Sequence, residues 1–276
     1  MDSIQYASDL HLEFYELHEY KFENFIVPKS DILVLLGDIG YPSKSLYKIF
    51  LNDCSKNFKL VLLITGNHEY YANFETSMDS VNTTISELCK LLPNVIFLNN
   101  STYSYKYEDK EIIFLGSTLW SFILPNERII VKQVSNDLCN IFLDGQPITI
   151  NQINELHKCN VEWIQTTLDS IDNDNATIII LTHHLPTYKA IVPKYRNSNC
   201  NSMFASNLDH IIKKYNIFAW LFGHTHSKID IVVENTILLC NPLGYTTAYG
   251  GRENEKYDAS CTLLLPDKKC DITPQN

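Results

Sequence analysis

The chain has 276 residues, of which 45% are hydrophobic, so it can bury a large core, and we expect one domain over residues 1–266. Its formal net charge of −10 argues against a duplex nucleic acid held on a broad basic face. Its eight cysteines contain no CxxC pair, which disfavours a zinc knuckle or a compact disulfide framework. The sequence shows neither a signal segment nor a membrane-length apolar stretch, so we expect a cytoplasmic protein.

Short apolar runs alternate with segments of helical period, which indicates an α/β layered domain. Helical spacing occurs within residues 78–92, 153–171 and 208–215. Two stretches, 121–150 and 187–203, lack a clear period and are expected to be long loops, and residues 267–276 a loose tail. The expected strands, in chain order, are 3–8, 32–36, 60–64, 95–98, 112–115, 177–181, 218–222, 229–233, 236–240 and 261–265.

Five of these apolar runs end in residues that can bind a metal ion. Taken alone, Asp and Asn after a strand are usually turn formers or helix caps, and a lone His is usually an ordinary buried or surface residue. Here, however, metal-binding residue types follow five separate strands. The carboxyl ends of strands in an α/β sheet are where ligand sites form, so the five occurrences together favour one shared site. If the D-x-H and H-x-H segments are extended, alternate side chains face one ion. The residues concerned are Asp9 and His11, Asp38, Asn67 and His68, His183 and His184, and His224 and His226.

These motifs resemble those of the calcineurin-like metallophosphoesterases. The family pattern is D-x-H, G-D, G-N-H-D/E, a later His and G-H-x-H, and the chain has DLH, GD, GNHE, THH and GHTH in that order. SDLHLEF at 8–14, THHLP at 182–186 and NPLGY at 241–245 resemble an uncharacterised single-domain branch. The resemblance covers residues 3–245 and implies a four-layer α/β/β/α sandwich, in which two mixed sheets are flanked by helices.

The resemblance also implies a binuclear metal centre. It gives one ion to Asp9, His11 and His226, the other to Asn67, His183 and His224, and both to Asp38 as a bridge. Mixed nitrogen and oxygen ligands suit manganese, iron, zinc or cobalt. Two divalent ions and two carboxylates leave a local charge of about +2, which attracts phosphate, and a hydroxide between the ions is the expected nucleophile.

Roles for neighbouring residues follow from the same resemblance. His68 is expected to protonate the leaving oxygen, with an orienting role as the alternative. Glu69 is expected to cap the following segment. Adjacency does not decide between His183 and His184, and we choose His183 because the first His of such a pair is the ligand in the family. Tyr41 resembles the tyrosinate ligand of purple acid phosphatases. We expect His11 to occupy that coordination position on the metal, so Tyr41 is not counted among the ligands.

Substrate contacts are less determined by the sequence. Residues 187–206 contain Lys189, Lys194 and Arg196 and no acidic residue, so they form either a solvated loop or a binding site for a second phosphate. His184 is the remaining candidate contact. Leu138 and Cys139 stand where the resemblance leads us to expect a basic residue, which leaves contacts in that segment open.

Three functions compete. We favour a metal-dependent phosphatase or phosphodiesterase acting on a small-molecule or nucleotide ester. A nuclease is disfavoured by the acidic charge and by the lack of an accessory domain. A scaffold that acts by protein binding is disfavoured because every ligand position of the pattern is filled.

Overall fold

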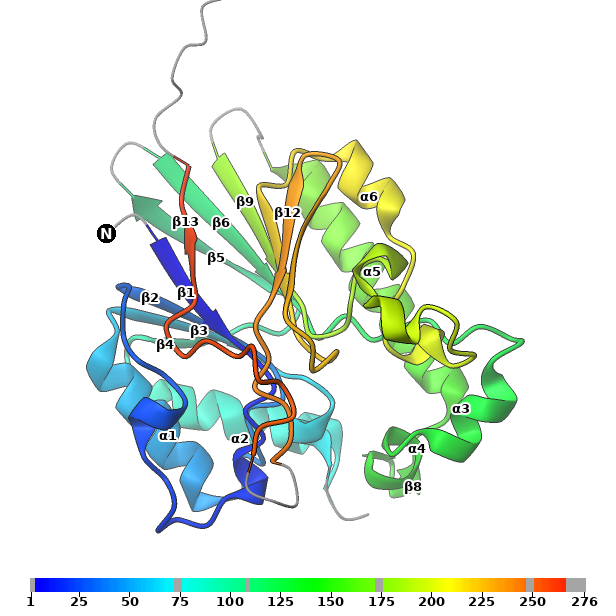
Figure 1. Ribbon diagram of the computed structural model, residues 1–276, viewed down its shortest axis with the longest axis horizontal. Coiled ribbons are helices and arrows are strands. Elements are labelled where there is room, and N and C mark those ends of the chain that lie inside the picture. Colours follow the sequence, from blue (N-terminus) through cyan, green and yellow to red (C-terminus); the bar gives the residue numbers. More distant parts are fainter. Residues whose placement is uncertain (1–2, 72–75, 108–109, 172–175, 247–250, 267–276) are drawn as a thin grey trace, which may run out of the picture.

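The computed structural model describes residues 3–71, 76–107, 110–171, 176–246 and 251–266, so the predicted tail at 267–276 lies outside the described residues. Two sheets form the centre of the molecule (Figure 1). The first has the order β13-β1-β2-β3-β4, and only β13 is antiparallel to its neighbour. Its strands are β1 (Ser3–Ala7), β2 (Ile32–Leu36), β3 (Leu60–Ile64), β4 (Val95–Phe97) and β13 (Thr262–Leu264).

The second sheet has the order β11-β12-β10-β9-β6-β5, with the outer strands β11 and β5 antiparallel and the others parallel. Strands β11 and β12 form a tight hairpin that turns at Glu234 and Asn235. The strands of this sheet are β5 (Ser101–Tyr107), β6 (Lys110–Gly116), β9 (Ala176–Leu181), β10 (Ala219–Phe222), β11 (Ile229–Val233) and β12 (Thr236–Cys240). A small hairpin consists of β7 (Phe142–Leu143) and β8 (Gln146–Pro147).

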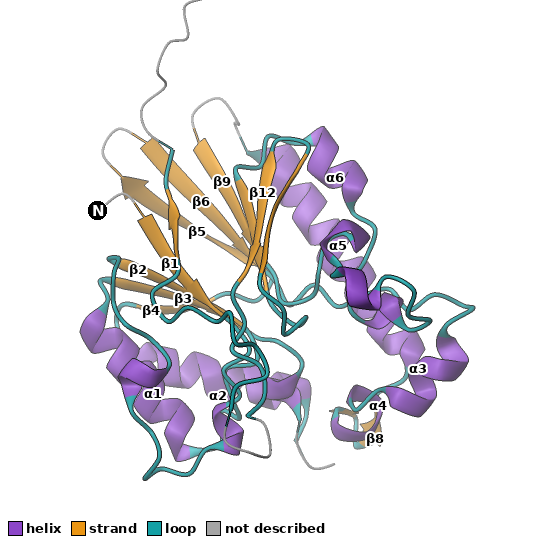
Figure 2. Cartoon of the chain, viewed as in Figure 1, coloured by secondary structure: helices purple, strands orange, loops and turns teal. Residues whose placement is uncertain are grey.

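The outer side of each sheet is covered by helices (Figure 2). Helices α1 and α2 cover the first sheet, and α5 and α6 lie along the second. The longest, α5, begins at a capping box in which Thr149 and Gln152 satisfy each other's backbone N–H groups. The helices are α1 (Ser45–Asn57), α2 (Met78–Lys90), α3 (Arg128–Val134), α4 (Asp137–Asn140), α5 (Ile150–Ser170) and α6 (Asp209–Lys214).

The central parallel strands are buried on both faces. Val34 in β2 and Leu62 in β3 point between the sheets, where they pack with Phe114 and Leu221 of the second sheet. Leu33 and its neighbours on the other face pack against α1 and α2. Burial on both faces explains why these strands show continuous rather than alternating hydrophobicity. The predicted four-layer sandwich is confirmed.

Several elements of the fold were not predicted. Helix α1 buries Leu46, Phe50 and Cys54. Their spacing is helical and visible in the sequence, but we did not predict a helix from it. Strand β5 reads STYSYKY, an edge strand whose serines and lysine masked the alternation. The expected loop at 121–150 contains α3, α4 and the small hairpin, which are too short to show a period.

Within the described residues, seven cysteines are free thiols. None of the described helices has the length and apolar character needed to cross a membrane.

Candidate metal centre

The seven predicted metal ligands all follow strands at one end of the two sheets. Asp9, Asp38 and Asn67 come after the parallel strands β1, β2 and β3. His183 and His224 come after the parallel strands β9 and β10. Carboxyl ends of parallel strands meet at one edge, and packing the two sheets face to face brings both edges together. His11 and His226 follow two residues later on the first and last of these loops.

The backbone of these loops is sharply turned, not extended. Asp9, His11, Asp38, His224 and His226 have φ between +46° and +68°, the left-handed region. The expectation that D-x-H and H-x-H are extended segments is therefore wrong, because the first and last residues of both motifs have left-handed φ. Each such non-glycine residue costs of order 1–3 kcal/mol, and strain of this kind gathers at functional sites.

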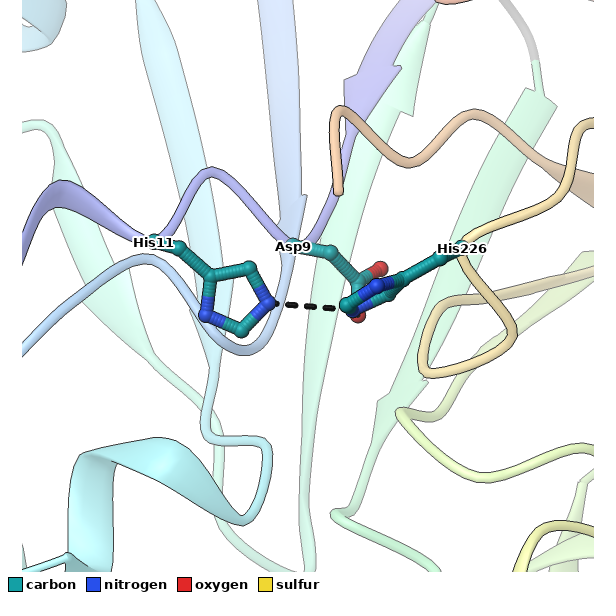
Figure 3. A group of neighbouring side chains, drawn as sticks. All are labelled: Asp9, His11 and His226. Atoms are coloured by element: carbon teal, nitrogen blue, oxygen red, sulfur yellow. Dashed lines mark hydrogen bonds and ion pairs between the residues drawn. The ribbon is translucent and has the colours of Figure 1, made fainter. Parts of the chain in front are cut away.

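The first group of donors consists of Asp9, His11 and His226 (Figure 3). The Nε2 atoms of His11 and His226 lie 3.0 Å apart, and His226 Nε2 lies 3.5 Å from Asp9 Oδ1. Asp9 is completely buried and His11 is 1% exposed. Asp9 also accepts the backbone N–H of His224 at 2.9 Å, which fixes the carboxylate.

The outer nitrogens of these two rings are held by carboxylates. His11 Nδ1 donates to Glu13 at 3.1 Å, and His226 Nδ1 donates to Glu253 at 2.6 Å. In the neutral ring the proton is then on Nδ1, so both Nε2 atoms present lone pairs to the same small space. A metal-binding His ordinarily donates its other N–H to a carboxylate or carbonyl, so this arrangement fits a cation between the rings.

The second group consists of Asn67, His183 and His224 around Asp38. His183 Nε2 lies 3.3 Å from Asp38 Oδ2 and 3.1 Å from Asn67 Oδ1, while its Nδ1 donates to the Leu36 carbonyl at 2.8 Å. His224 Nε2 is buried and has no hydrogen-bond partner among the described residues. A buried nitrogen without a hydrogen-bond partner is energetically unfavourable. A cation bound to its lone pair and to the neighbouring carboxylate would remove that cost.

Asp38 lies between the two groups. Its Oδ2 is 3.3 Å from His183 Nε2 and 4.0 Å from His11 Nε2, and its Oδ1 accepts the backbone N–H of His68 at 2.8 Å. The loops that carry Asp38 and His68 approach closely because Gly37 and Gly66 have no side chains. A Cβ on Gly37, which has φ of +83°, would lie 2.3 Å from the Gly66 nitrogen.

The buried carboxylates stabilise positive charge in the cluster, either on the imidazole rings or on a bound cation. Burial lowers the pKa of His183, but Asp38 outweighs it and raises that pKa to about 9. Burial likewise lowers the pKa of His226, and Asp9 with Glu253 raises it to about 10. Burial raises the pKa of Asp38, but the imidazoles, His183 first, hold it well below its usual range. Protons and metal ions therefore compete for these donors.

His68 stands beside the donors with both ring nitrogens engaged. Its Nδ1 donates to Glu13 Oε1 at 2.9 Å, the same oxygen that holds His11. Its Nε2 lies 3.1 Å from the Tyr245 hydroxyl, and its ring stacks on Tyr71 at 4.2 Å. The Glu13 side chain is 1% exposed, so it couples the two imidazoles away from water.

Glu69 has a different role from the predicted helix cap. Its carboxylate accepts the backbone N–H groups of Gly66, Asp38 and Ile39 at 2.7, 3.0 and 2.8 Å. It therefore ties the loop after β3 to the loop after β2. Burial, followed by the charge of Asp38, raises the pKa of Glu69 to about 7.

Asp137 was missed by sequence reasoning. It lies in α4, is 7% exposed, and its Oδ1 accepts from Asn67 Nδ2 at 2.9 Å and from the Tyr71 hydroxyl at 2.7 Å. This contact turns the amide so that Asn67 Oδ1 faces His183. Asp137 occurs in the segment where we expected a basic residue, and no local pattern distinguishes it from a surface Asp.

His184 lies behind the donors. Its ring is 1% exposed, 4.3 Å from the His224 ring and 5.3 Å from Trp120, and burial with the charge of His183 lowers its pKa to about 3. We assign His184 no substrate contact, because a buried neutral ring packed behind its neighbours is out of reach. Tyr41 is half-buried, and burial with the charges of Glu13 and Asp38 raises its pKa, which disfavours a tyrosinate.

The three basic residues of segment 187–206 have different surroundings. Lys189 pairs with Asp209 at 2.9 Å. Lys194 lies over the Tyr195 ring and lines a second hollow, whose wall also includes His226. Arg196 is exposed on the same segment. A role for these side chains in binding phosphate stays a prediction.

A cavity of about 390 Å³ opens over the donor groups. Part of its wall is formed by Asp38, Asn67, His68, His224 and His226. Its volume is in the range of small-molecule binding sites. The converging donors are therefore accessible to a ligand of that size.

The chain is similar to known proteins over most of its length. A family model described as calcineurin-like phosphoesterase matches residues 4–228. The chain belongs to this family. An uncharacterized protein of Acanthamoeba polyphaga mimivirus is 34% identical over 263 residues, which cover 89% of this chain and 92% of that protein.

Solved structures agree with this calcineurin-like phosphoesterase in fold. A phosphopantetheinyl hydrolase from Mycobacterium tuberculosis has a TM-score of 0.71 at 15% identity, over 88% of this chain and 89% of that one. A putative 5'-nucleotidase from Staphylococcus aureus has a TM-score of 0.52 at 15% identity, over 97% of this chain and 55% of that one. The family and the clusters of His and Asp support metal-dependent hydrolysis of a phosphate ester.

Proposed function

We propose that this phosphoesterase is a binuclear-metal-dependent phosphohydrolase that cleaves a phosphomonoester or phosphodiester of small-molecule or nucleotide size. The observation that carries the proposal is the convergence of nitrogen and oxygen lone pairs in two adjacent groups that share Asp38. One ion is assigned to Asp9, His11 and His226. The other is assigned to Asn67, His183 and His224.

The donor set indicates which ions fit. Imidazole nitrogens combined with carboxylate and amide oxygens suit manganese, iron, zinc or cobalt better than calcium. When bound, two such ions supply Lewis-acid charge that neutralises the phosphate and makes a water molecule nucleophilic near neutral pH. Glu13, Glu253 and the Leu36 carbonyl keep the proton of each facing imidazole on Nδ1 and so leave Nε2 free to bind.

His68 supplies the proton that the departing alkoxide needs. Burial lowers the pKa of His68, but the charges of Asp38 and Glu13 raise it overall. Glu13 holds Nδ1, and Nε2 points to the Tyr245 hydroxyl at the cavity wall. A ring fixed in this way can transfer its Nε2 proton to the leaving oxygen.

The test is a substrate and metal panel on metal-stripped protein. Manganese, iron, zinc or cobalt is restored in turn, and hydrolysis of p-nitrophenyl phosphate and bis(p-nitrophenyl) phosphate is followed. We expect turnover with at least one ion and none in Asp38→Ala, while Asp230→Ala, an exposed change on β11, retains it. No turnover of either ester with any of the ions, or full turnover in Asp38→Ala, would contradict the proposal.

A further inference from the structure

The cavity over the donor groups is lined by chemically different sets of side chains. Besides the donors and polar residues such as Asn136 and Ser198, its wall contains a set of apolar and aromatic side chains: Val134, Leu185, Ile191, Tyr195, Met203 and Phe204. The Phe204 ring lies 5.0 Å from the His224 ring, so the apolar wall begins directly beside a proposed metal ligand. Whatever group is attached to a phosphate at the donors would extend along this wall.

The apolar wall is held by its own hydrogen bonds. The N–H of Leu185 donates to the Phe204 carbonyl at 3.0 Å, which closes the segment into a loop. Asn201 Nδ2 donates to the Tyr195 carbonyl at 2.9 Å, and the N–H of Ser202 donates to Glu127 at 2.8 Å. The wall is therefore positioned before any ligand binds, as small-molecule sites usually are.

Charge at the cavity disfavours a second anionic group. Among the described residues that line it there is no Lys or Arg, whereas Asp137 and Glu253 are present. The segment predicted from sequence to be basic thus contributes its apolar side chains to the wall. Lys189 is paired with Asp209 instead, and Lys194 faces the neighbouring hollow.

The mouth of the cavity also exposes apolar surface. Val134 is 49% exposed and Tyr195 is 46% exposed, although both are large hydrophobic residues. Exposed apolar groups that continue into a cavity mark a ligand-binding groove more often than isolated ones do. An apolar ligand would cover both side chains.

We propose that the cavity selects phosphate esters whose organic group is uncharged and largely apolar, such as an alkyl or aryl group, over nucleoside polyphosphates. This inference rests on the proposed phosphohydrolase function and narrows its substrate class. The ester's phosphate lies at the donors, and its organic group packs between Phe204, Ile191 and Tyr195. Transfer of each methylene from water to such a wall favours binding by about fourfold.

The test compares substrates that differ only in apolar length. With the ion that restores turnover, kcat/KM is measured for ethyl, butyl and hexyl phosphate, or for the corresponding alkyl p-nitrophenyl phosphates if only the diester control reacts. The leaving-group pKa is nearly constant in each series, so chemistry stays the same. We expect kcat/KM to rise with chain length and to fall roughly tenfold or more when the terminal methyl is replaced by a carboxylate.

Variants test whether the wall causes the preference. Val134→Lys places an ammonium group at the cavity mouth. It should reduce the rise of kcat/KM with chain length and increase kcat/KM for the substrate that ends in a carboxylate. Ile129→Lys, on the same helix but 77% exposed and outside the wall, should change neither. Tyr195→Ala, at a half-exposed position, should also reduce the effect of chain length.

The possible results are distinguishable. Failure to hydrolyse any ester overturns the proposed function and this inference with it. Hydrolysis of p-nitrophenyl esters with no effect of chain length, or a preference for the carboxylate substrate, overturns the inference alone. An increase in KM for hexyl phosphate on replacing Lys189, Lys194 and Arg196 with Ala would also overturn it and favour a basic subsite.

Discussion

Glu13 accepts hydrogen bonds from two imidazoles, and its replacement by Gln is expected to weaken both metal binding and proton donation. Its Oε1 lies 3.1 Å from His11 Nδ1 and 2.9 Å from His68 Nδ1, with the side chain 1% exposed. A hydrogen bond to a charged group contributes about 1.5–3 kcal/mol and a neutral one about 0.5–1.5 kcal/mol. Glu13→Gln keeps the acceptor and loses the charge, so each bond weakens by about 1–1.5 kcal/mol, or roughly tenfold.

Two assays separate the two bonds. Calorimetric titration of metal-stripped protein should show one ion bound roughly tenfold more weakly, as expected for the partner of a metal-binding His. Turnover should fall roughly tenfold for an alkyl leaving group and less for p-nitrophenolate, because only the poor leaving group needs the proton from His68. Glu16→Gln, an exposed change three residues away, is the matched control. Unchanged metal affinity together with equal rate losses for both leaving groups would refute this role of Glu13.

Two further substitutions test the neighbouring contacts. His68→Ala should lower kcat by about 10²–10⁴ for poor leaving groups and by less for p-nitrophenyl esters, whereas equal losses would contradict the acid role. Asp137→Ala removes the partner of the Asn67 amide and should weaken one ion by about 10–100-fold in the same titration. Cys139→Ala, an exposed change in the same short helix, should leave that affinity unchanged, and an equal effect of both variants would point to a general disturbance of α4.

The strand-end motifs were predictable because each is marked locally. Asp38 and His183 follow apolar runs that are recognisable as buried strands, and parallel strands present their carboxyl ends at one edge. The sequence therefore indicates which residues meet, even though it misjudged the backbone between Asp9 and His11. The order of the motifs indicated the family, and the fold of that family predicted the four-layer sandwich.

The residues that hold the ligands were not predictable in the same way. Glu13, Asp137 and Glu253 reach the donors from a 3₁₀ turn, a four-residue helix and a loop, none of which has a sequence period. Glu69 was assigned to a cap because its local sequence allows one, whereas tertiary packing directs it to the N–H groups of another loop. Which side of segment 187–206 faces the cavity likewise depends on how its turns pack.

The central claim is that two adjacent groups of donors sharing Asp38 hold two metal ions. The most direct measurement is X-ray diffraction from crystals loaded with manganese, recorded with anomalous scattering from that metal. The account predicts two anomalous peaks, one among Asp9, His11 and His226 and the other among Asn67, His183 and His224, both in contact with Asp38. No peak within these groups, with full loading elsewhere on the chain, would contradict it.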